Sequence, residues 1–132
     1  MSQPTQVFIS YSHHDEGTAR ALTRALHKVG VEVWTPAQLP AGSDIDEGFR
    51  KKLEQADIVV LLITADSVRS PWTAFEFGAS VALRKRIVPV VVGDIPLDEI
   101  PYDLKHVQML HVDSKADVPR KVSEFLASSV AA

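Results

Sequence analysis

Cysteine is absent from the 132 residues of the chain, and so is any long apolar run. The lack of cysteine excludes a disulfide framework, a thiol nucleophile, an iron–sulfur cluster and a cysteine-ligated zinc site. The longest nearly unbroken apolar run, residues 58–63, is far too short to cross a bilayer. The N-terminus is polar and lacks the basic flank and apolar stretch of a secretion signal. We therefore predict a cytoplasmic domain that makes no contact with a membrane.

An excess of basic charge is also missing. The chain has 14 Lys and Arg against 17 Asp and Glu, which gives a formal net charge of −3. Its longest basic run, Arg84-Lys85-Arg86, is too short to be a polybasic arm, so we predict no nucleic-acid partner. Apolar residues, in contrast, make up 45% of the chain. A chain of this length fits one domain, which can bury about two thirds of its unfolded surface in a core.

Five short runs rich in β-branched residues alternate with helical patterns. The runs cover residues 7–9, 31–34, 58–63, 87–92 and 107–112. This alternation predicts an α/β fold: a three-layer flavodoxin-like sandwich whose five-stranded parallel sheet has the order 2-1-3-4-5 and helices on both faces. Pro89 lies inside the fourth run and cannot donate to a sheet ladder, so we expect that strand to engage fully only from Pro89 onward.

The ends of the chain differ in pattern from the middle. Residues 1–5 are expected to be disordered, and residues 6–126 to form the domain. Ser114 and Asp117 predict a capping box at the start of the last helix. The small, unpatterned residues 127–132 are expected to be a tail or the start of a linker.

The strand order predicts where a ligand would bind. Open parallel sheets bind ligands outside the carboxyl ends of their strands, at the switch point in strand order, which here lies between the first and third strands. The residues delivered to this mouth, or flanking it, are mostly polar or aromatic. They are Ser10, Tyr11, Ser12 and His13 after the first strand, residues 64–70 after the third, and Trp34 with residues 35–42 after the second.

Glu76 is the only charged residue of the predicted third helix between Pro71 and Leu83. At about 100° per residue, it lies at the rim of an apolar arc that includes Trp72. A carboxylate in this place is either desolvated in a cleft or extended into solvent from the edge of the stripe. An apolar-flanked carboxylate near a switch point is a candidate for a functional group with a tuned pKa.

Other polar groupings give weaker signals. His13 and His14 are adjacent on a loop and point in different directions, so we expect no metal site, and Asp15 is better interpreted as a helix N-cap. Ser10 or Ser12 near His13 would suggest a nucleophile with its base, but no G-x-S-x-G sequence is present. There is no glycine-rich phosphate loop. A bound pyrophosphate would therefore rest on helix N-termini.

Four segments follow one family pattern, in the right order over nearly the whole chain. They are Val7 to Ser12; Gly30 to Trp34 with the loop that closes at Pro40-Ala41-Gly42; Ser70 to Glu76, with Trp four residues before Glu; and Ile87 to Val92, proline included. In this order they resemble the first box, the second strand and BB loop, the third-helix motif and the fourth strand of Toll/interleukin-1 receptor (TIR) domains.

The resemblance implies two functions. Many bacterial, plant and some animal TIR domains cleave NAD+ and release nicotinamide with ADP-ribose or a cyclic ADP-ribose isomer. The enzymes carry a glutamate on the third helix, and Glu76 occupies that place. The chain is therefore expected to be an NAD+ nucleosidase of immune-type or defence signalling, with NAD+ as substrate and no cofactor. The alternative is a non-catalytic TIR–TIR interaction or adaptor module. A nucleoside deoxyribosyltransferase-like enzyme is a third hypothesis.

The same resemblance implies which residues meet the substrate. Ser10, Tyr11 and Ser12 would contact the nicotinamide–ribose half of NAD+, and Trp34 and Trp72 would form walls of the cleft. These assignments come from the family pattern.

The resemblance also implies self-association through the BB loop and the third helix. Leu39, Pro40 and Gly42 would be interface residues of that loop. Nothing in the sequence looks like a sensor, so activation is expected to come from self-assembly, a partner protein or a sensor domain beyond Ala132.

Overall fold

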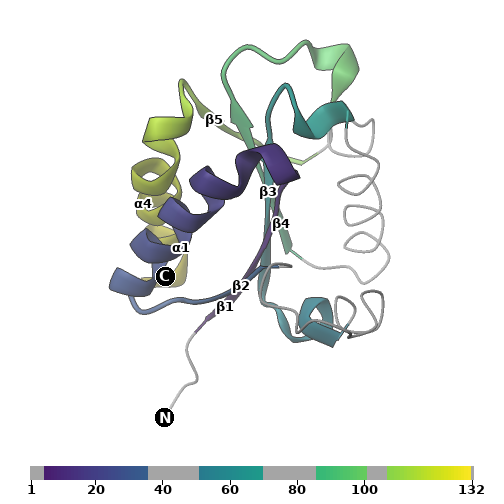
Figure 1. Ribbon diagram of the computed structural model, residues 1–132. Helices are drawn as coiled ribbons and strands as arrows, with labels where there is room; N and C mark the ends of the chain where they lie inside the picture. The colour runs from purple at the N-terminus through teal and green to yellow at the C-terminus, as the bar shows by residue number, and fades with distance from the viewer. Residues whose placement is uncertain (1–4, 36–50, 70–85, 101–106, 132) are drawn as a thin grey trace.

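A single parallel sheet forms the centre of the molecule (Figure 1). The structure is a computed structural model that describes residues 5–35, 51–69, 86–100 and 107–131. Its strands are β1 (Gln6–Ser10), β2 (Glu32–Trp34), β3 (Ile58–Ile63), β4 (Arg86–Val92) and β5 (Leu110–Val112). Every neighbouring pair is parallel, and the strand order is β2-β1-β3-β4-β5. The predicted flavodoxin-like order is confirmed.

Helices cover both faces of this sheet. The helices α1 (Glu16–Lys28) and α4 (Val118–Ala131) lie together on one face, and the helical residues 51–55 lie on the other (Figure 1). Short 3-10 turns follow four of the strands: η1 (His13–Asp15), η3 (Ser67–Arg69), η4 (Leu97–Glu99) and η6 (Lys115–Asp117). The domain is therefore built in three layers.

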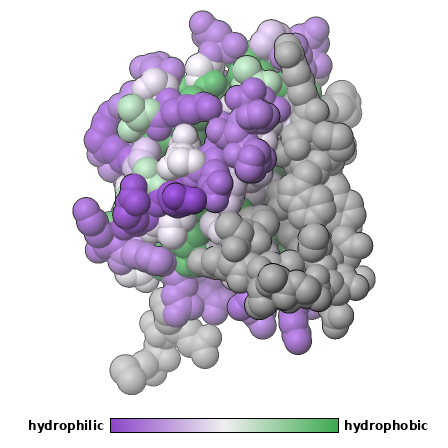
Figure 2. Space-filling model, viewed as in Figure 1, coloured by the Kyte–Doolittle hydropathy of each residue, from purple (hydrophilic) through white to green (hydrophobic). Residues whose placement is uncertain are grey.

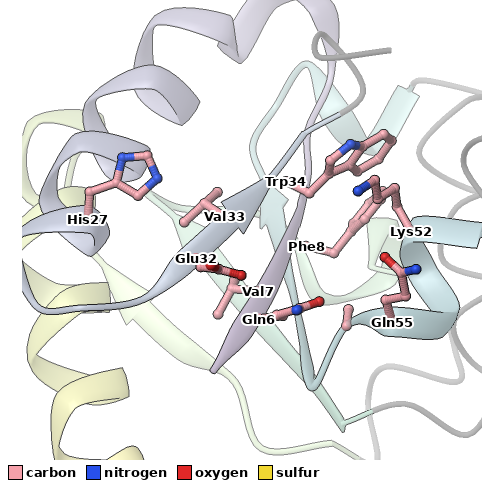
Figure 3. A pocket seen from close by; sticks show the side chains of 10 residues that line it. Gln6, Val7, Phe8, His27, Glu32, Val33, Trp34, Lys52 and Gln55 are labelled. Atoms are coloured by element: carbon pink, nitrogen blue, oxygen red, sulfur yellow. The ribbon is translucent and has the colours of Figure 1, made fainter. Parts of the chain in front are cut away.

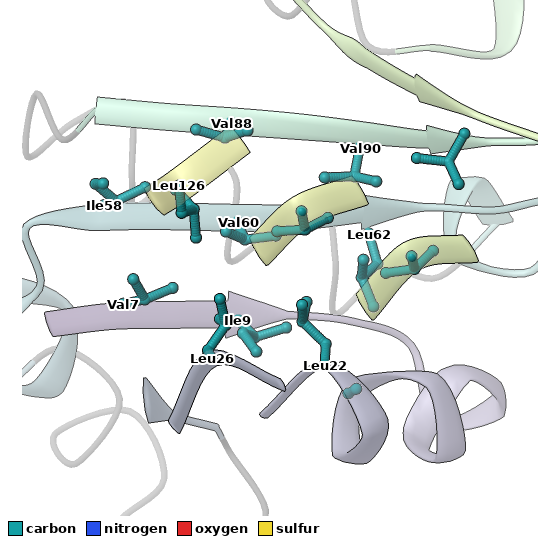
Figure 4. Packing of buried hydrophobic residues seen from close by; sticks show 14 of the residues in the cluster. Val7, Ile9, Leu22, Leu26, Ile58, Val60, Leu62, Val88, Val90 and Leu126 are labelled. Carbon is teal, nitrogen blue, oxygen red and sulfur yellow. The ribbon is translucent and has the colours of Figure 1, made fainter. Parts of the chain in front are cut away.

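The alternation of side chains along the strands divides the core in two. On one face, Val7 and Ile9 of β1 pack with Leu22 and Leu26 of α1 and with the buried residues of α4 (Figure 4). On the other face, Phe8 packs with Leu53 of the helical residues 51–55. Full burial of one Leu side chain contributes about 1.5–3 kcal/mol, so both layers are held to the sheet by the hydrophobic effect.

The end of α1 returns the chain to the sheet. Gly30 has a φ of 82°, a left-handed conformation that glycine adopts without a steric penalty. Its N–H donates to the carbonyl of His27, and the N–H of Val31 donates to the carbonyl of Leu26, so this is a Schellman motif. The motif ends α1 and leads directly into β2.

The strand β4 pairs with both of its neighbours only after Pro89, so the expectation that it engages fully from that position onward is confirmed. The ladder with β3 begins at the pair Ile58↔Arg86, three positions before Pro89. The ladder with β5 begins only at Val90↔Leu110. Pro89 therefore lies just before the stretch in which β4 is paired on both sides, and its missing N–H removes no bond to β5.

The ends of the last two elements differ from expectation. The fifth strand is confined to Leu110–Val112, because only these residues pair with β4. The expected tail at 127–132 is instead helical up to Ala131. Alanine and serine are compatible with the helical backbone, so α4 continues beyond its buried stripe.

The outer surface of the α1 and α4 layer is mainly hydrophilic (Figure 2). Within the described ranges, no helix combines the length and the apolar character needed to span a membrane.

Candidate functional site

The carboxyl ends of β1 and β3 meet at the switch point of the sheet. The two strands pair from Val7↔Ile58 to Ser10↔Leu61, so the loops that follow them leave the sheet side by side. Four buried polar residues follow these strands: Ser12, Asp15, Thr64 and Ser67. The structure thus places polar side chains where the strand order predicts a site.

The carboxylate of Asp15 is at the centre of this group. Its Oδ2 accepts hydrogen bonds from Ser12 Oγ at 3.0 Å and from Thr64 Oγ1 at 2.7 Å. Its Oδ1 lies 2.8 Å from Lys115 Nζ, and the Asp15 side chain is 0% exposed. We call Ser12, Asp15, Thr64, Ser67 and Lys115 the Asp15 cluster. A buried carboxylate is stable only when it is paired in this way.

Asp15 does not cap α1 with its side chain, which corrects the sequence interpretation. The residue occupies the N-cap position before Glu16, but its carboxylate makes no capping hydrogen bond. Instead, the N–H of Asp15 donates to the carbonyl of Ser12 at 2.8 Å, which closes the turn η1. This turn directs the carboxylate toward the hydroxyl of Thr64 and the ammonium group of Lys115.

Lys115 joins the group from the turn after β5. The carboxylate of Asp15, whose Oδ1 is 2.8 Å from Lys115 Nζ, raises the pKa of Lys115 above its ordinary value of 10.5. Burial acts in the opposite direction, and the charges of Asp15 and Asp66 add to the rise. Asp66 Oδ2 is 4.0 Å from Lys115 Nζ, and the lysine side chain remains 46% exposed. Lys115 is therefore a cation held between two carboxylates.

We expect the folded chain to lose stability as the pH rises above 10.5. The pKa of Lys115 is higher in the folded than in the unfolded chain, so the stability from this ion pair is fully present below that pH and is lost as folded Lys115 deprotonates. Lys115→Arg keeps its charge and should flatten the fall in Tm between about pH 10 and 12. Thermal unfolding followed by circular dichroism measures this. Lys121→Arg on the exposed surface is the matched control, and equal slopes for both variants would contradict the expectation.

Thr64 and Ser67 fix the direction in which the chain leaves β3. The N–H of Thr64 donates to Ser67 Oγ at 2.8 Å, and the N–H of Ser67 donates to Thr64 Oγ1 at 3.1 Å. This reciprocal pattern resembles a capping box and leads into η3. Because Thr64 Oγ1 also donates to Asp15, the turn after β3 is tied directly to the turn after β1.

The three predicted contact residues after β1 have different surroundings. Ser10 is buried at the end of the strand, and alternation places it on the same sheet face as Phe8. Tyr11 packs against the core cluster on the α1 side of the sheet. Ser12 belongs to the Asp15 cluster. Of these three residues, Ser10 is the one that lies on the same face of the sheet as the helical residues 51–55.

Trp34 lines a cavity of about 300 Å³ beside the paired strands β1 and β2. Its ring lies against Phe8, with centroids 4.9 Å apart and an interplanar angle of 31°. Lys52 and Gln55 of the helical residues 51–55 line the same cavity, on the side of the strands where Phe8 and Trp34 lie (Figure 3). The lining residues are Gln6, Val7, Phe8, His27, Glu32, Val33, Trp34, Lys52, Gln55 and Ala56. The cavity therefore combines an aromatic wall with amide and charged groups.

The remaining predicted site residues lie outside the described residues. They are the catalytic candidate Glu76, the cleft residue Trp72 and the interface residues Leu39, Pro40 and Gly42. The turn η3 ends at Arg69, immediately before the segment that carries Trp72 and Glu76.

Histidines near the switch point contact each other. The rings of His13 and His14 meet edge to face, with centroids 6.0 Å apart. In the part of the chain that the structure describes, no group of three or more His, Cys, Asp or Glu residues is placed to hold a metal ion.

Sequence reasoning missed the role of Lys115 and the cavity residues Lys52 and Gln55. The one signal for Lys115 is its position directly after the fifth strand, whose carboxyl end opens on the same edge as β1 and β3. Lys52 and Gln55 lie in a helical segment whose pattern gives no sign of a cavity.

Comparison with known proteins gives consistent results. The family model described as "TIR domain" matches residues 7–126. The uncharacterized protein y4lF of Sinorhizobium fredii is 34% identical over 70 residues, which cover 50% of this chain but only 22% of that protein. The TIR domain of the Toll-related receptor TRR-2 from Hydra magnipapillata superimposes with a TM-score of 0.75 at 18% identity, covering 92% of this chain and 95% of that one. The CMP N-glycosidase BcmB of Clostridium botulinum superimposes with a TM-score of 0.69 at 16% identity, covering 91% and 99%.

Proposed function

The chain belongs to the TIR domain family, and on this premise we propose that it cleaves the nicotinamide–ribose bond of NAD+. The products are nicotinamide and ADP-ribose or a cyclic ADP-ribose isomer, and the context is immune-type or defence signalling. TIR domains often have glycosidase or NADase activity, and this membership is the observation that carries the proposal. The C. botulinum neighbour, named as a CMP N-glycosidase, shows that a similar fold supports N-glycosidic chemistry in another protein.

One carboxylate is sufficient for this reaction. Ordinary glycosidases need two, because an alkoxide leaving group must be protonated. Nicotinamide leaves NAD+ as a neutral pyridine from a cationic pyridinium, so no general acid is required. The ribose carbon then bonds to the oxygen of water, whose proton is released to solvent, or to a second group of the same molecule when the product is cyclic. The remaining task is to stabilise the positive charge that develops on the ribose, which a carboxylate in a water-excluded site does effectively. We assign this role to Glu76, as an electrostatic stabiliser or as a transient nucleophile.

Three residues that we assign to substrate contact follow or end β1, at the switch point of the sheet. Ser10 is buried at the carboxyl end of β1, on the sheet face of Phe8, and we assign it to the nicotinamide–ribose half of NAD+ with Tyr11 and Ser12. Trp34 and Trp72 are assigned to the walls of the cleft. Trp34 is the last residue of β2, and its ring lies against Phe8 of the neighbouring strand β1.

Assembly is part of the proposal, because TIR domains self-associate. We propose that the BB loop, with Leu39, Pro40 and Gly42, and the third helix form the contacts between copies. A partner protein or a sensor domain would then act by bringing copies together. The activity of dilute, isolated domains is accordingly expected to be low.

The test is NAD+ consumption by the wild-type chain at increasing density, in solution and immobilised on beads. We expect nicotinamide release that rises more steeply than protein concentration, since activity depends on association. Chromatography of the products separates linear from cyclic ADP-ribose. A folded wild-type chain that releases no nicotinamide at any density contradicts the proposal. That result would favour the interaction module, for which the likeness to the TIR domain of a Toll-related receptor is the supporting observation.

A further inference from the structure

The proposed chemistry makes no use of Asp15, yet this carboxylate connects three loops at the switch point. Its partners are Ser12 in the turn after β1, Thr64 after β3 and Lys115 after β5. These segments lie far apart in the sequence and meet at the carboxyl edge of the sheet. Because Asp15, Ser12 and Thr64 are buried, their hydrogen bonds form in a water-poor setting where geometry is well defined.

The connections continue from Asp15 into both segments that flank the proposed site. On one side, Ser12 directly follows Tyr11 and Ser10, the residues assigned to the substrate. On the other side, Thr64 Oγ1 donates to Asp15 and accepts from the N–H of Ser67, the first residue of η3. The segment that carries Glu76 begins directly after η3. One carboxylate thus links the turn η1 after β1 to the turn η3 after β3.

We propose that Asp15 is a positioning residue, which holds the Ser10–Ser12 segment in register with the end of β3, so that the residues assigned to substrate contact keep a fixed position relative to the turn η3. The inference rests on the proposed function and deepens it, since Asp15 itself touches no reacting atom. Lys115 supplies the counter-charge that keeps the carboxylate paired at 2.8 Å. A small displacement of substrate-positioning groups is enough to lower the rate of an enzyme substantially.

The sharpest test uses a matched pair at Thr64. Thr64→Val removes the hydroxyl with little change in shape, so the links to Asp15 and to the Ser67 N–H are lost together. Thr64→Ser keeps the hydroxyl and both links. At a temperature where all proteins are folded by circular dichroism, we expect Thr64→Val to raise the KM for NAD+ and lower kcat/KM by about tenfold. Thr64→Ser should stay within about twofold of the wild type, as rescue by the conservative variant.

The split between KM and kcat separates positioning from stability. A merely stabilising role lowers the folded fraction, which reduces the apparent kcat but leaves the KM of the folded enzyme unchanged. A folded Thr64→Val variant with wild-type KM and kcat overturns the inference, as does an equal loss in Thr64→Ser. If the wild type itself releases no nicotinamide at any density, the proposed function fails first and the positioning role falls with it. The wild-type activity alone therefore distinguishes a failure of the proposed function from a failure of the positioning role.

Discussion

Glu76→Gln is expected to lower the rate of nicotinamide release from NAD+ by about a thousandfold, while the domain stays folded. Glutamine has the shape of glutamate but carries no negative charge, so it leaves the positive charge developing on the ribose without its stabiliser. The measurement is nicotinamide release at the bead density where the wild type is active. Circular dichroism and thermal unfolding of the same preparation establish that the variant is folded.

Glu124→Gln is the matched control for this experiment. Glu124 is exposed on α4, where its carboxylate lies 3.8 Å from Arg120. Exposed ion pairs of this kind contribute little to stability, so the control should keep wild-type turnover. A folded Glu76→Gln variant that turns over NAD+ as fast as Glu124→Gln would contradict the assignment of Glu76 as the catalytic carboxylate.

Asp15→Ala is expected to destabilise the domain by about 3 kcal/mol. The substitution removes the acceptor for the buried hydroxyls of Ser12 and Thr64 and the partner of Lys115. Each buried donor left without a partner costs about 1–3 kcal/mol, and the half-exposed lysine recovers part of its loss by hydration. Urea unfolding at neutral pH, followed by circular dichroism, gives the difference in unfolding free energy directly.

Asp117 offers an unusually close control within the same chain. Ser12 to Asp15 and Ser114 to Asp117 are both Ser-x-x-Asp segments, and in both the Asp N–H donates to the Ser carbonyl. In both, the serine hydroxyl also donates to the carboxylate, at 3.0 Å in the first and 3.3 Å in the second. The Asp117 side chain is 39% exposed, so Asp117→Ala should cost less than about 1 kcal/mol. If Asp15→Ala and Asp117→Ala lowered the free energy of unfolding equally, the burial of Asp15 would add nothing to the stability of the domain.

These two segments also show what sequence can and cannot predict. Ser-x-x-Asp before a helix is a local pattern, and the local turn it forms is the same at both places. The difference between them comes from Thr64, which is 49 positions away from Asp15, and from the burial that the sheet imposes. Spacing along the chain carries no information about such a partner, so Asp15 looked like an ordinary N-cap.

The fold was easier to predict because its signals are repetitive. Alternating runs and helices predict a parallel sheet of flavodoxin-like order, which the structure confirms. Pro89 is tolerated inside β4 because only the ladder with β3 crosses it, and the ladder with β5 begins at the next residue, Val90. The functional role of Glu76 stays a prediction, since the residue lies outside the described part of the chain.

The shortness of β2 and β5 has a consequence for any experiment at high density. Each edge strand has three residues, and each carries an exposed charged or polar side chain, Glu32 in β2 and His111 in β5. Short, polar edges offer few free backbone groups to the sheet of another molecule. Crowding this protein therefore favours contacts through its loops and helices over the sheet-to-sheet stacking that leads to fibrils.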